Sequence, residues 1–461
     1  MQSRNPSVYR GAVLSPHGPA GLAPLRFLAL VMALFLAWSL TVPAGLFGAR
    51  PATQAWADES GETSRAIAIA YDNSGSMVTD SDKWCGAKYS LEVLAAMLNP
   101  SDTLAVFAMD APGKKLELSG SKGSGEAAKA VHGADLGVSD WTDAAATEEA
   151  FAYLKASPAQ EKYLVITTDG AFNKSGNLEA VQSTAAKAAA DGMTVIYLAI
   201  GNDADTISSD PGSGISVKLA SSDNILNTMT EVANQVFGRD ALDASAIDLG
   251  AGKLNLEVPM DKLIVFAQGK DVQVGDLTDS AGAVVKPTVA NVKFSDRPSA
   301  NAKYDPFKID EKLQGVVATY DADIPRGECT LDISGADNVD VYYKPYVNIA
   351  VSLEDANGIG YTLMPGEDNV LSAGDYDVAY AFLDPFTGDE LDSSLLYPAT
   401  FKTKVESGGN VSTSTGDEKL HIPVGTVNIV STAETKGGAK ASQSYRGVQV
   451  SPAITPMQID L

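Results

Sequence analysis

The chain has 461 residues, of which 45% are apolar and 20% are charged, and its formal net charge is -24 at pH 7. It is longer than one ordinary domain, and its composition is that of a soluble globular protein rather than a disordered chain or a polytopic membrane protein. The acidity argues against nucleic acid and anionic lipid as partners, because both would repel the protein. Its simplest interpretation is a well-solvated surface.

The first block of the chain, residues 1–57, contains arginine but no aspartate, glutamate or lysine. An uncharged run over residues 27–49 precedes a small-x-small cleavage pattern at residues 55–57 (AWA). This arrangement predicts a signal peptide, and the alternative is an uncleaved transmembrane anchor, since a membrane helix needs about 20 residues. A proline and a glycine interrupt the run and favour cleavage. Both interpretations place the rest of the chain at the cell surface or outside the cell.

Residues 65–239 alternate short apolar runs with amphipathic stretches, a pattern typical of an α/β fold with a doubly wound, mostly parallel sheet. The expected strands are almost continuously apolar, as strands buried on both faces should be. The clearest helix is expected over residues 225–237, behind a capping Ser222 or Asp223. The expected strands are residues 66–71, 103–109, 163–167 and 193–200, and the other expected helices are residues 89–98, 147–154 and 178–190.

Beyond residue 240 the pattern changes to short alternating segments separated by Gly, Asp, Pro and Ser, with no lasting helical period. This pattern predicts β-sandwich-like structure. We expect a β-rich domain over residues 240–345 and an immunoglobulin-like β-rich domain over residues 346–461, with the boundary near Pro345. The sequence leaves open whether this region is one domain or two.

Asp72, Ser74 and Ser76 form a D-x-S-x-S pattern directly after the first expected strand. Ligand sites of an open parallel sheet lie at the carboxyl ends of its strands. Alternate residues of an extended loop face the same side, so one carboxylate and two hydroxyls converge there, and Gly75 lets the backbone turn. Oxygen ligands favour Mg²⁺, Ca²⁺ or Mn²⁺ over zinc or copper. The alternative is that these side chains only cap the following helix.

Two later segments add to this pattern. A later apolar strand ends in Thr168-Asp169-Gly170, and Thr142 lies on the intervening loop before a helix. With these residues in place, residues 65–239 resemble the von Willebrand factor type A (VWA) family. That family has a metal-ion-dependent adhesion site built from a D-x-S-x-S motif, a threonine and an aspartate in a T-D-G turn.

The resemblance implies a metal site made of Asp72, Ser74, Ser76, Thr142 and Asp169. The serines and the threonine would be direct or near-direct ligands, and the aspartates would act largely through water. One departure from the family pattern is the loop at residues 139–143 (SDWTD), which lacks the glycine pair common before that threonine. Thr147 is therefore a rival ligand, although it lies where the next helix should already have begun.

The charge of such a site indicates its chemistry. A divalent ion neutralised by only two aspartates keeps an open coordination position and enough Lewis acidity to take a carboxylate from a partner. Mg²⁺ is the favoured ion, with Ca²⁺ and Mn²⁺ as alternatives. The sequence thus predicts an exported surface or secreted protein that binds a protein or extracellular-matrix ligand through the metal. The alternative is a structural envelope component in which the metal only stabilises the VWA domain.

Three short segments carry a second, narrower resemblance. Residues 71–77, 84–89 and 169–173 resemble exported VWA-domain proteins of Gram-positive bacteria, which carry β-rich segments after the VWA domain. For the β-rich region itself the likeness is slight, so we interpret that region as a spacer or a second recognition surface.

An enzymatic site is not indicated. The histidines are His17, His132 and His421, and none lies in a recognisable nucleophile motif; a Walker-type glycine loop is also missing from the sequence. Cys85 and Cys329 lie far apart and form no C-x-x-C motif. Export permits a disulfide between them, but two buried thiols are the preferred interpretation.

Overall fold

The computed structural model of the chain has two compact units, Met1–Gly61 and Glu62–Leu461, and all described residues belong to the second. The predicted signal peptide or anchor at residues 1–57 therefore lies outside the described residues. No helix within the described part is long and apolar enough to cross a membrane. The description covers residues 63–452 except 110–113, 139–141, 171, 173–175, 202–205, 209–212, 222–223, 249, 294–311, 365–367, 397–398 and 436–439.

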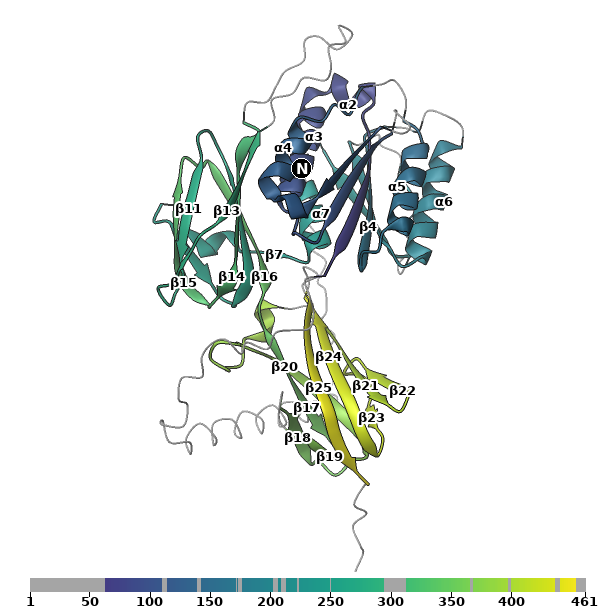
Figure 1. Ribbon diagram of the computed structural model, residues 1–461, viewed down its shortest axis with the longest axis vertical. Helices are drawn as coiled ribbons and strands as arrows, with labels where there is room; N and C mark the ends of the chain where they lie inside the picture. Colours follow the sequence, from purple (N-terminus) through teal and green to yellow (C-terminus); the bar gives the residue numbers. More distant parts are fainter. Residues whose placement is uncertain are drawn as a thin grey trace, which may run out of the picture. The chain divides into compact units, whose positions relative to one another are not determined.

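Residues 65–220 contain a six-stranded sheet in the order β3-β2-β1-β4-β5-β6, of which β4 is labelled in Figure 1. Neighbouring strands from β2 to β6 pair in parallel, and β3 runs antiparallel to β2. The predicted doubly wound, mostly parallel sheet is confirmed. The strands are β1 (Arg65–Tyr71), β2 (Thr103–Ala108), β3 (Lys115–Ser119), β4 (Glu161–Thr168), β5 (Thr194–Ile200) and β6 (Ile215–Ala220).

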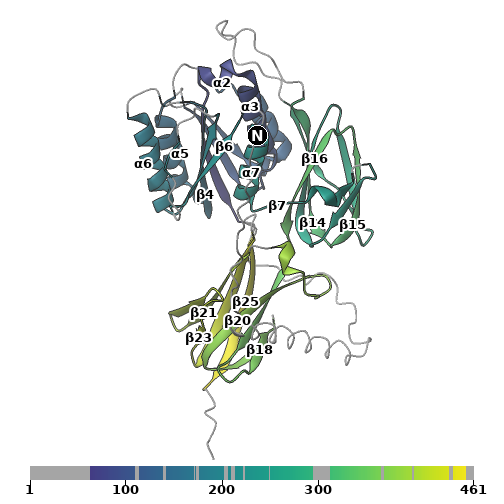
Figure 2. The same ribbon diagram turned by 180° about the vertical axis from the view of Figure 1, so that it is seen from behind.

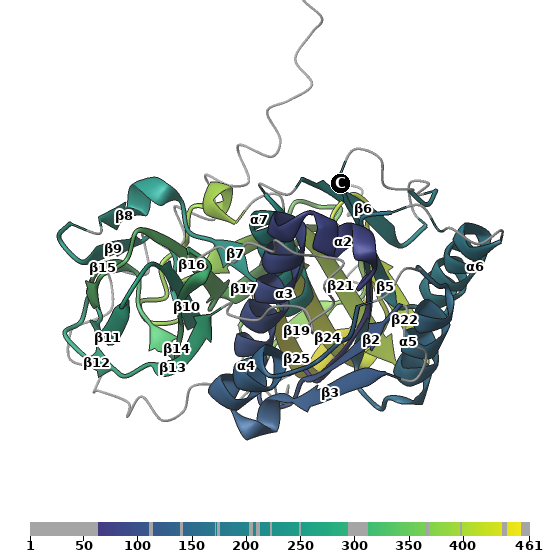
Figure 3. The same ribbon diagram turned by 90° about the horizontal axis from the view of Figure 1, so that it is seen from above.

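Helices cover both faces of this sheet, as Figure 3 shows from above. Successive side chains of a strand point to opposite faces, so the alternating sequence of β1 supplies two different surfaces. Its isoleucines pack in the core on the side of α3, α4 and α7, and its alanines pack on the side of α5 and α6. The helices are α2 (Gly75–Thr79), α3 (Ser81–Ala96), α4 (Ser124–His132), α5 (Ala145–Ala156), α6 (Asn177–Ala190) and α7 (Ile225–Phe237).

Two helices differ from the prediction at their starts. α3 begins at Ser81 rather than near residue 89, with Asp80 as its N-cap. α7 begins at Ile225 as predicted, but its N-cap is Asn224, and the proposed caps Ser222 and Asp223 lie outside the described residues. α3 and α7 approach closely at Gly86, where an added Cβ would lie 2.3 Å from Cγ2 of Ile225.

The next part of the chain forms two antiparallel sheets, in the orders β13-β14-β10-β16-β7 and β12-β11-β15-β9-β8 (Figure 2). β10 has two buried faces: Leu263 and Val265 pack against the second sheet, whereas Ile264 and Phe266 belong to the core around α3 and α7. The strands are β7 (Asp240–Ala241), β8 (Ile247–Asp248), β9 (Lys253–Leu256), β10 (Met260–Gln268), β11 (Gln273–Thr278), β12 (Val284–Val285), β13 (Thr288–Lys293), β14 (Gln314–Ile324), β15 (Gly327–Ser334) and β16 (Asn338–Pro345).

The C-terminal part repeats this architecture with two further sheets, in the orders β18-β17-β20-β23 and β19-β25-β24-β21-β22. The predicted sandwich-like fold of the C-terminal region is confirmed, while the domain boundaries stay predictions. The strands are β17 (Asn348–Glu354), β18 (Gly360–Leu363), β19 (Val370–Ser372), β20 (Gly374–Leu383), β21 (Thr400–Ser407), β22 (Asn410–Ser414), β23 (Leu420–Ile422), β24 (Gly425–Glu434) and β25 (Lys440–Ser451).

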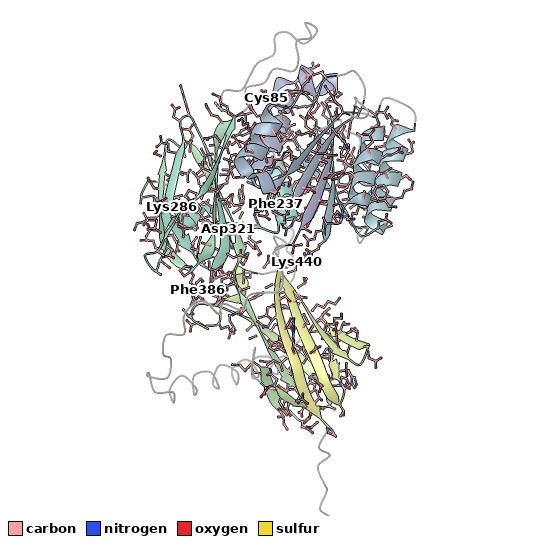
Figure 4. All side chains as sticks on the ribbon, viewed as in Figure 1. Cys85, Phe237, Lys286, Asp321, Phe386 and Lys440 are labelled. Atoms are coloured by element: carbon pink, nitrogen blue, oxygen red, sulfur yellow. The ribbon has the colours of Figure 1, made fainter. Side chains whose placement is uncertain are left out.

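The two cysteines lie in different cores. Cys85, on α3 (Figure 4), is buried in the core of the first domain, and Cys329, on β15, is buried in the core of the β-rich region. No disulfide joins them. Burial raises the pKa of the Cys329 thiol to about 11, so this cysteine is an ordinary buried apolar group at neutral pH.

Candidate metal centre

Asp72 lies at the carboxyl edge of the sheet, directly after β1, and its side chain is buried. Its backbone N–H donates to the carbonyl of Thr167 at 3.0 Å, so the loop starts in register with β4. The backbone N–H of Ser74 donates to Asp72 Oδ1 at 2.9 Å, and the hydroxyl of Thr168 donates to Oδ2 at 2.7 Å. The Asp72 carboxylate is therefore fixed by donors from two strand ends.

Ser76 connects the D-x-S-x-S loop to the T-D-G turn. Its hydroxyl donates to Asp169 Oδ1 at 2.7 Å and lies 2.8 Å from Oγ of Ser74. Ser74 is the N-cap of α2, but its side chain makes no capping hydrogen bond. The structure thus brings the two serines and both aspartates together, and the serine hydroxyls bond within this cluster rather than to the helix.

Thr142 enters the same region from the loop before α5, and its side chain is buried. An added Cβ at Gly170 would lie 3.6 Å from Ser76 Oγ and 4.0 Å from Thr142 Oγ1, so both hydroxyls face the T-D-G turn. The side chain of Asn177 donates to the Thr142 carbonyl at 3.0 Å and holds this loop to the start of α6.

The rival ligand Thr147 lies in the first turn of α5. Its side chain is fully buried, and its hydroxyl has no hydrogen-bond partner among the described residues. The assignment of Thr142 rather than Thr147 as the third hydroxyl ligand therefore stays a prediction. In its favour, the Thr142 hydroxyl lies close to the same glycine as that of Ser76.

Two buried carboxylates lie close together in this cluster, so a bound cation would stabilise their charged forms. Burial raises the pKa of Asp72, and the nearby Asp169 charge adds to the rise, whereas hydrogen bonds from Ser74 and Thr168 oppose it. The described residues contain no group of three or more His, Cys, Asp or Glu side chains placed to hold a metal. The candidate donors are instead two carboxylates and three hydroxyls, a set of oxygen atoms that fits Mg²⁺, Mn²⁺ or Ca²⁺.

Sequence reasoning missed three groups at this centre. Thr168 orients Asp72, Asn73 donates its side-chain N–H to the carbonyl of Leu136 at 3.0 Å, and Lys83 lies 3.0 Å from Asp169 Oδ2. Thr168 could have been found from the sequence, because it precedes the predicted ligand Asp169 and ends an apolar strand. The other two depend on contacts between segments, and no local pattern in the sequence indicates them.

Comparison with known proteins gives partial likenesses. No family model and no curated protein matches the chain. Among solved structures, a variant of the PilB minor pilin from Streptococcus sanguinis is 12% identical with a TM-score of 0.30, covering 39% of this chain and 62% of the pilin. This chain therefore spans less than two thirds of that pilin's length.

Two further structures have similar scores. The pilus adhesin SpaC from Lactobacillus rhamnosus GG is 12% identical with a TM-score of 0.28, covering 84% of this chain and 68% of SpaC. The vWF domain of the type V pili tip protein Mfa5 from Porphyromonas gingivalis is 10% identical with a TM-score of 0.28, covering 38% of this chain and 95% of that domain. None of these matches assigns a function to this chain.

Proposed function

We propose that this chain is an exported cell-surface or secreted protein that binds a protein or matrix ligand through a divalent cation. The cation would be Mg²⁺ first, with Mn²⁺ or Ca²⁺ as alternatives, and the ligand would offer a carboxylate. One observation carries the proposal: the Ser76 hydroxyl bonds to both Ser74 and Asp169, which joins two loops far apart in sequence into one cluster of oxygen atoms. The residues that would hold the ion are Asp72, Ser74, Ser76, Thr142 and Asp169.

The carboxylate of Asp72 and the three hydroxyls would have different roles at the ion. Asp72 is held by the Ser74 N–H and by the Thr168 hydroxyl, so it would supply a fixed negative charge to the ion. The hydroxyls of Ser74, Ser76 and Thr142 would supply neutral oxygens, so the negative charge at the ion would come from Asp72 and Asp169 alone. The bound ion supplies Lewis acidity toward an incoming carboxylate.

The direction of approach follows from burial. Asp72 is fully buried, Ser74 and Asp169 are nearly so, and Ser76 is exposed. The cluster therefore runs from a buried carboxylate to an exposed hydroxyl, and a ligand would meet the ion from the Ser76 side. The hydroxyls are bonded to a carboxylate and to each other rather than to a histidine base, which favours binding over nucleophilic catalysis.

Metal binding is tested by thermal melts of the full chain in EDTA, Mg²⁺, Mn²⁺ and Ca²⁺. At 100 times the dissociation constant, a metal should stabilise the folded chain by about 2.7 kcal/mol. We expect this gain to be lost in Asp72→Ala and in the milder Ser76→Ala. The matched control is Ser121→Ala. Ser119 and Ser121 are also two residues apart, and their hydroxyl oxygens also lie 2.8 Å from each other, but this pair is not part of the candidate centre.

The open coordination position is tested with Mn²⁺ and water-proton relaxation. A peptide with one glutamate should displace Mn²⁺-bound water and lower the relaxation rate, and the same peptide with glutamine should not. Metal stabilisation without any effect of the glutamate peptide would favour the structural envelope role. Metal-independent melting of wild type and both variants would overturn the metal site itself.

A further inference from the structure

Lys83 places an ammonium group on one of the two aspartates of the candidate metal centre. Its Nζ lies 3.0 Å from Asp169 Oδ2, and the side chains of Lys83 and Asp169 are 20% and 1% exposed. The other carboxylate oxygen, Oδ1, accepts the hydrogen bond from Ser76. Both oxygens of Asp169 are therefore engaged, one by a hydroxyl of the centre and one by the lysine.

The position of Lys83 is not one that its own helix favours. α3 begins at Ser81 after the N-cap Asp80, so Lys83 lies in the first helical turn. The helix dipole makes that end positive and disfavours a cation there. The carboxylate of Asp169, on a different element, is the group that compensates the ammonium.

The path of the lysine side chain also depends on the sheet. An added Cβ at Gly201, which follows β5, would lie 3.4 Å from Lys83 Nζ and 3.7 Å from Cε. Gly201 has a φ of 99°, a backbone conformation that favours glycine. Lys83 therefore reaches Asp169 in van der Waals contact with the end of β5, at a glycine whose backbone conformation disfavours any side chain.

The charges set a conflict between this lysine and a metal. Asp72 and Asp169 can supply two negative charges, and Lys83 compensates one of them in a setting with little solvent. A divalent ion bound by the same aspartates would be repelled by an ammonium group at contact distance from Asp169. We propose that Lys83 is a built-in competitor of the metal, which compensates Asp169 when the ion is absent and leaves it when the ion binds.

This inference rests on the proposed metal site and adds a form of regulation to it. Since the lysine must be displaced, it weakens the affinity of the centre for the ion. Metal binding and release of the Lys83 amine are then linked, so whatever holds the amine away from Asp169 also strengthens metal binding. An acidic group of a partner that paired with Lys83 would act in this way.

The first test is Mn²⁺ affinity, measured by isothermal titration calorimetry on the full chain. Lys83→Met should bind Mn²⁺ about tenfold more tightly than wild type, because the competing charge is gone and the side chain keeps a similar length. Lys83→Arg keeps the charge and should bind like wild type. Lys187→Met, at an exposed position of α6, controls for the change in net charge.

The second test measures the lysine itself. Mass spectrometry after brief amine acetylation should show Lys83 modified several-fold faster in Mg²⁺ than in EDTA, with Lys187 as the internal reference. Equal Mn²⁺ affinity in wild type and Lys83→Met, or Lys83 acetylation that is insensitive to metal in a protein that binds metal, overturns the competition while the metal site stands. Absence of Mn²⁺ binding in both wild type and Lys83→Met overturns the proposed function instead.

Discussion

The hydroxyl of Thr168 donates a hydrogen bond of 2.7 Å to Oδ2 of Asp72, and this bond ties the last residue of β4 to the first residue after β1. Both side chains are fully buried. A buried carboxylate depends on such donors because it has lost the water that would otherwise solvate it. The neighbouring Thr167 makes a longer bond, 3.4 Å, to the carbonyl of Ala70.

These adjacent threonines give a matched pair of substitutions. Thr168→Val should lower the free energy of unfolding by about 2 kcal/mol, because it removes a hydrogen bond to a charged, buried acceptor. Thr167→Val should cost no more than about 1 kcal/mol, since its bond is long and its acceptor is neutral. Urea denaturation in EDTA measures both values. Equal losses would mean that the Thr168 bond contributes nothing specific to Asp72.

A second prediction concerns Lys262 of β10, which is buried against the loop after α3. Its Nζ donates to Oδ1 of Asn99 at 2.9 Å. Lys262→Met should lower the free energy of unfolding by about 2 kcal/mol, because Asn99 Oδ1 keeps only the longer bond of 3.5 Å from Arg239, although the volume is nearly kept. Denaturant titration followed by circular dichroism measures the loss.

The control for Lys262 is Lys253, whose ammonium pairs with Glu328 at 2.7 Å on the surface. Both side chains of that pair are about half exposed, so water already solvates the two charges and Lys253→Met should cost clearly less than Lys262→Met. The Lys253 contact, although it is the shorter of the two, is thus expected to be the weaker contributor. A larger loss for Lys253→Met than for Lys262→Met would show that burial does not decide the order.

The third prediction is a pH dependence set by Cys329. Burial raises the pKa of its thiol from 9.0 to about 11, so the folded chain holds this proton more tightly than the unfolded chain. Its contribution to stability is complete below pH 9 and is lost as the pH rises through 11. The total loss is roughly 2–3 kcal/mol for two pKa units.

The measurement compares wild type with Cys329→Ala by urea denaturation between pH 8 and 11.5. Tyrosines of the unfolded chain also titrate in this range, because burial raises the pKa of their folded counterparts, but they are present in both proteins and cancel in the difference. The difference in unfolding free energy should change only above pH 9. A difference that stays constant to pH 11.5 would contradict the raised thiol pKa.

The elements that could be predicted from the sequence are strands buried on both faces and helices with one buried face. The central strands are continuously apolar, and α7 has a regular apolar face, so both were predictable from composition along the chain. β3 and β6 were not, because these strands are only partly buried and carry polar residues. The start of α3 was missed because residues 81–88 show no apolar period, although Trp84 and Cys85 are buried.

The same contrast holds at the candidate centre. The D-x-S-x-S loop and the T-D-G turn follow strand ends, so their meeting follows from parallel pairing of β1 and β4 alone. Lys83 was not predictable, since its contact with Asp169 depends on the direction of a long side chain across the end of β5. Local patterns indicate which donors converge, and only tertiary structure shows which cation already lies against them.

The short strand β7 gives the protein a mechanical property. α7 ends at Phe237, and Asp240 and Ala241 already pair with Tyr343 and Tyr342 of β16. The segment that follows α7 is thus part of the antiparallel sheet of β10, β14 and β16 instead of forming a free tether. A stretching force along this segment would have to break the β7–β16 pairing before it could draw α7 out of place.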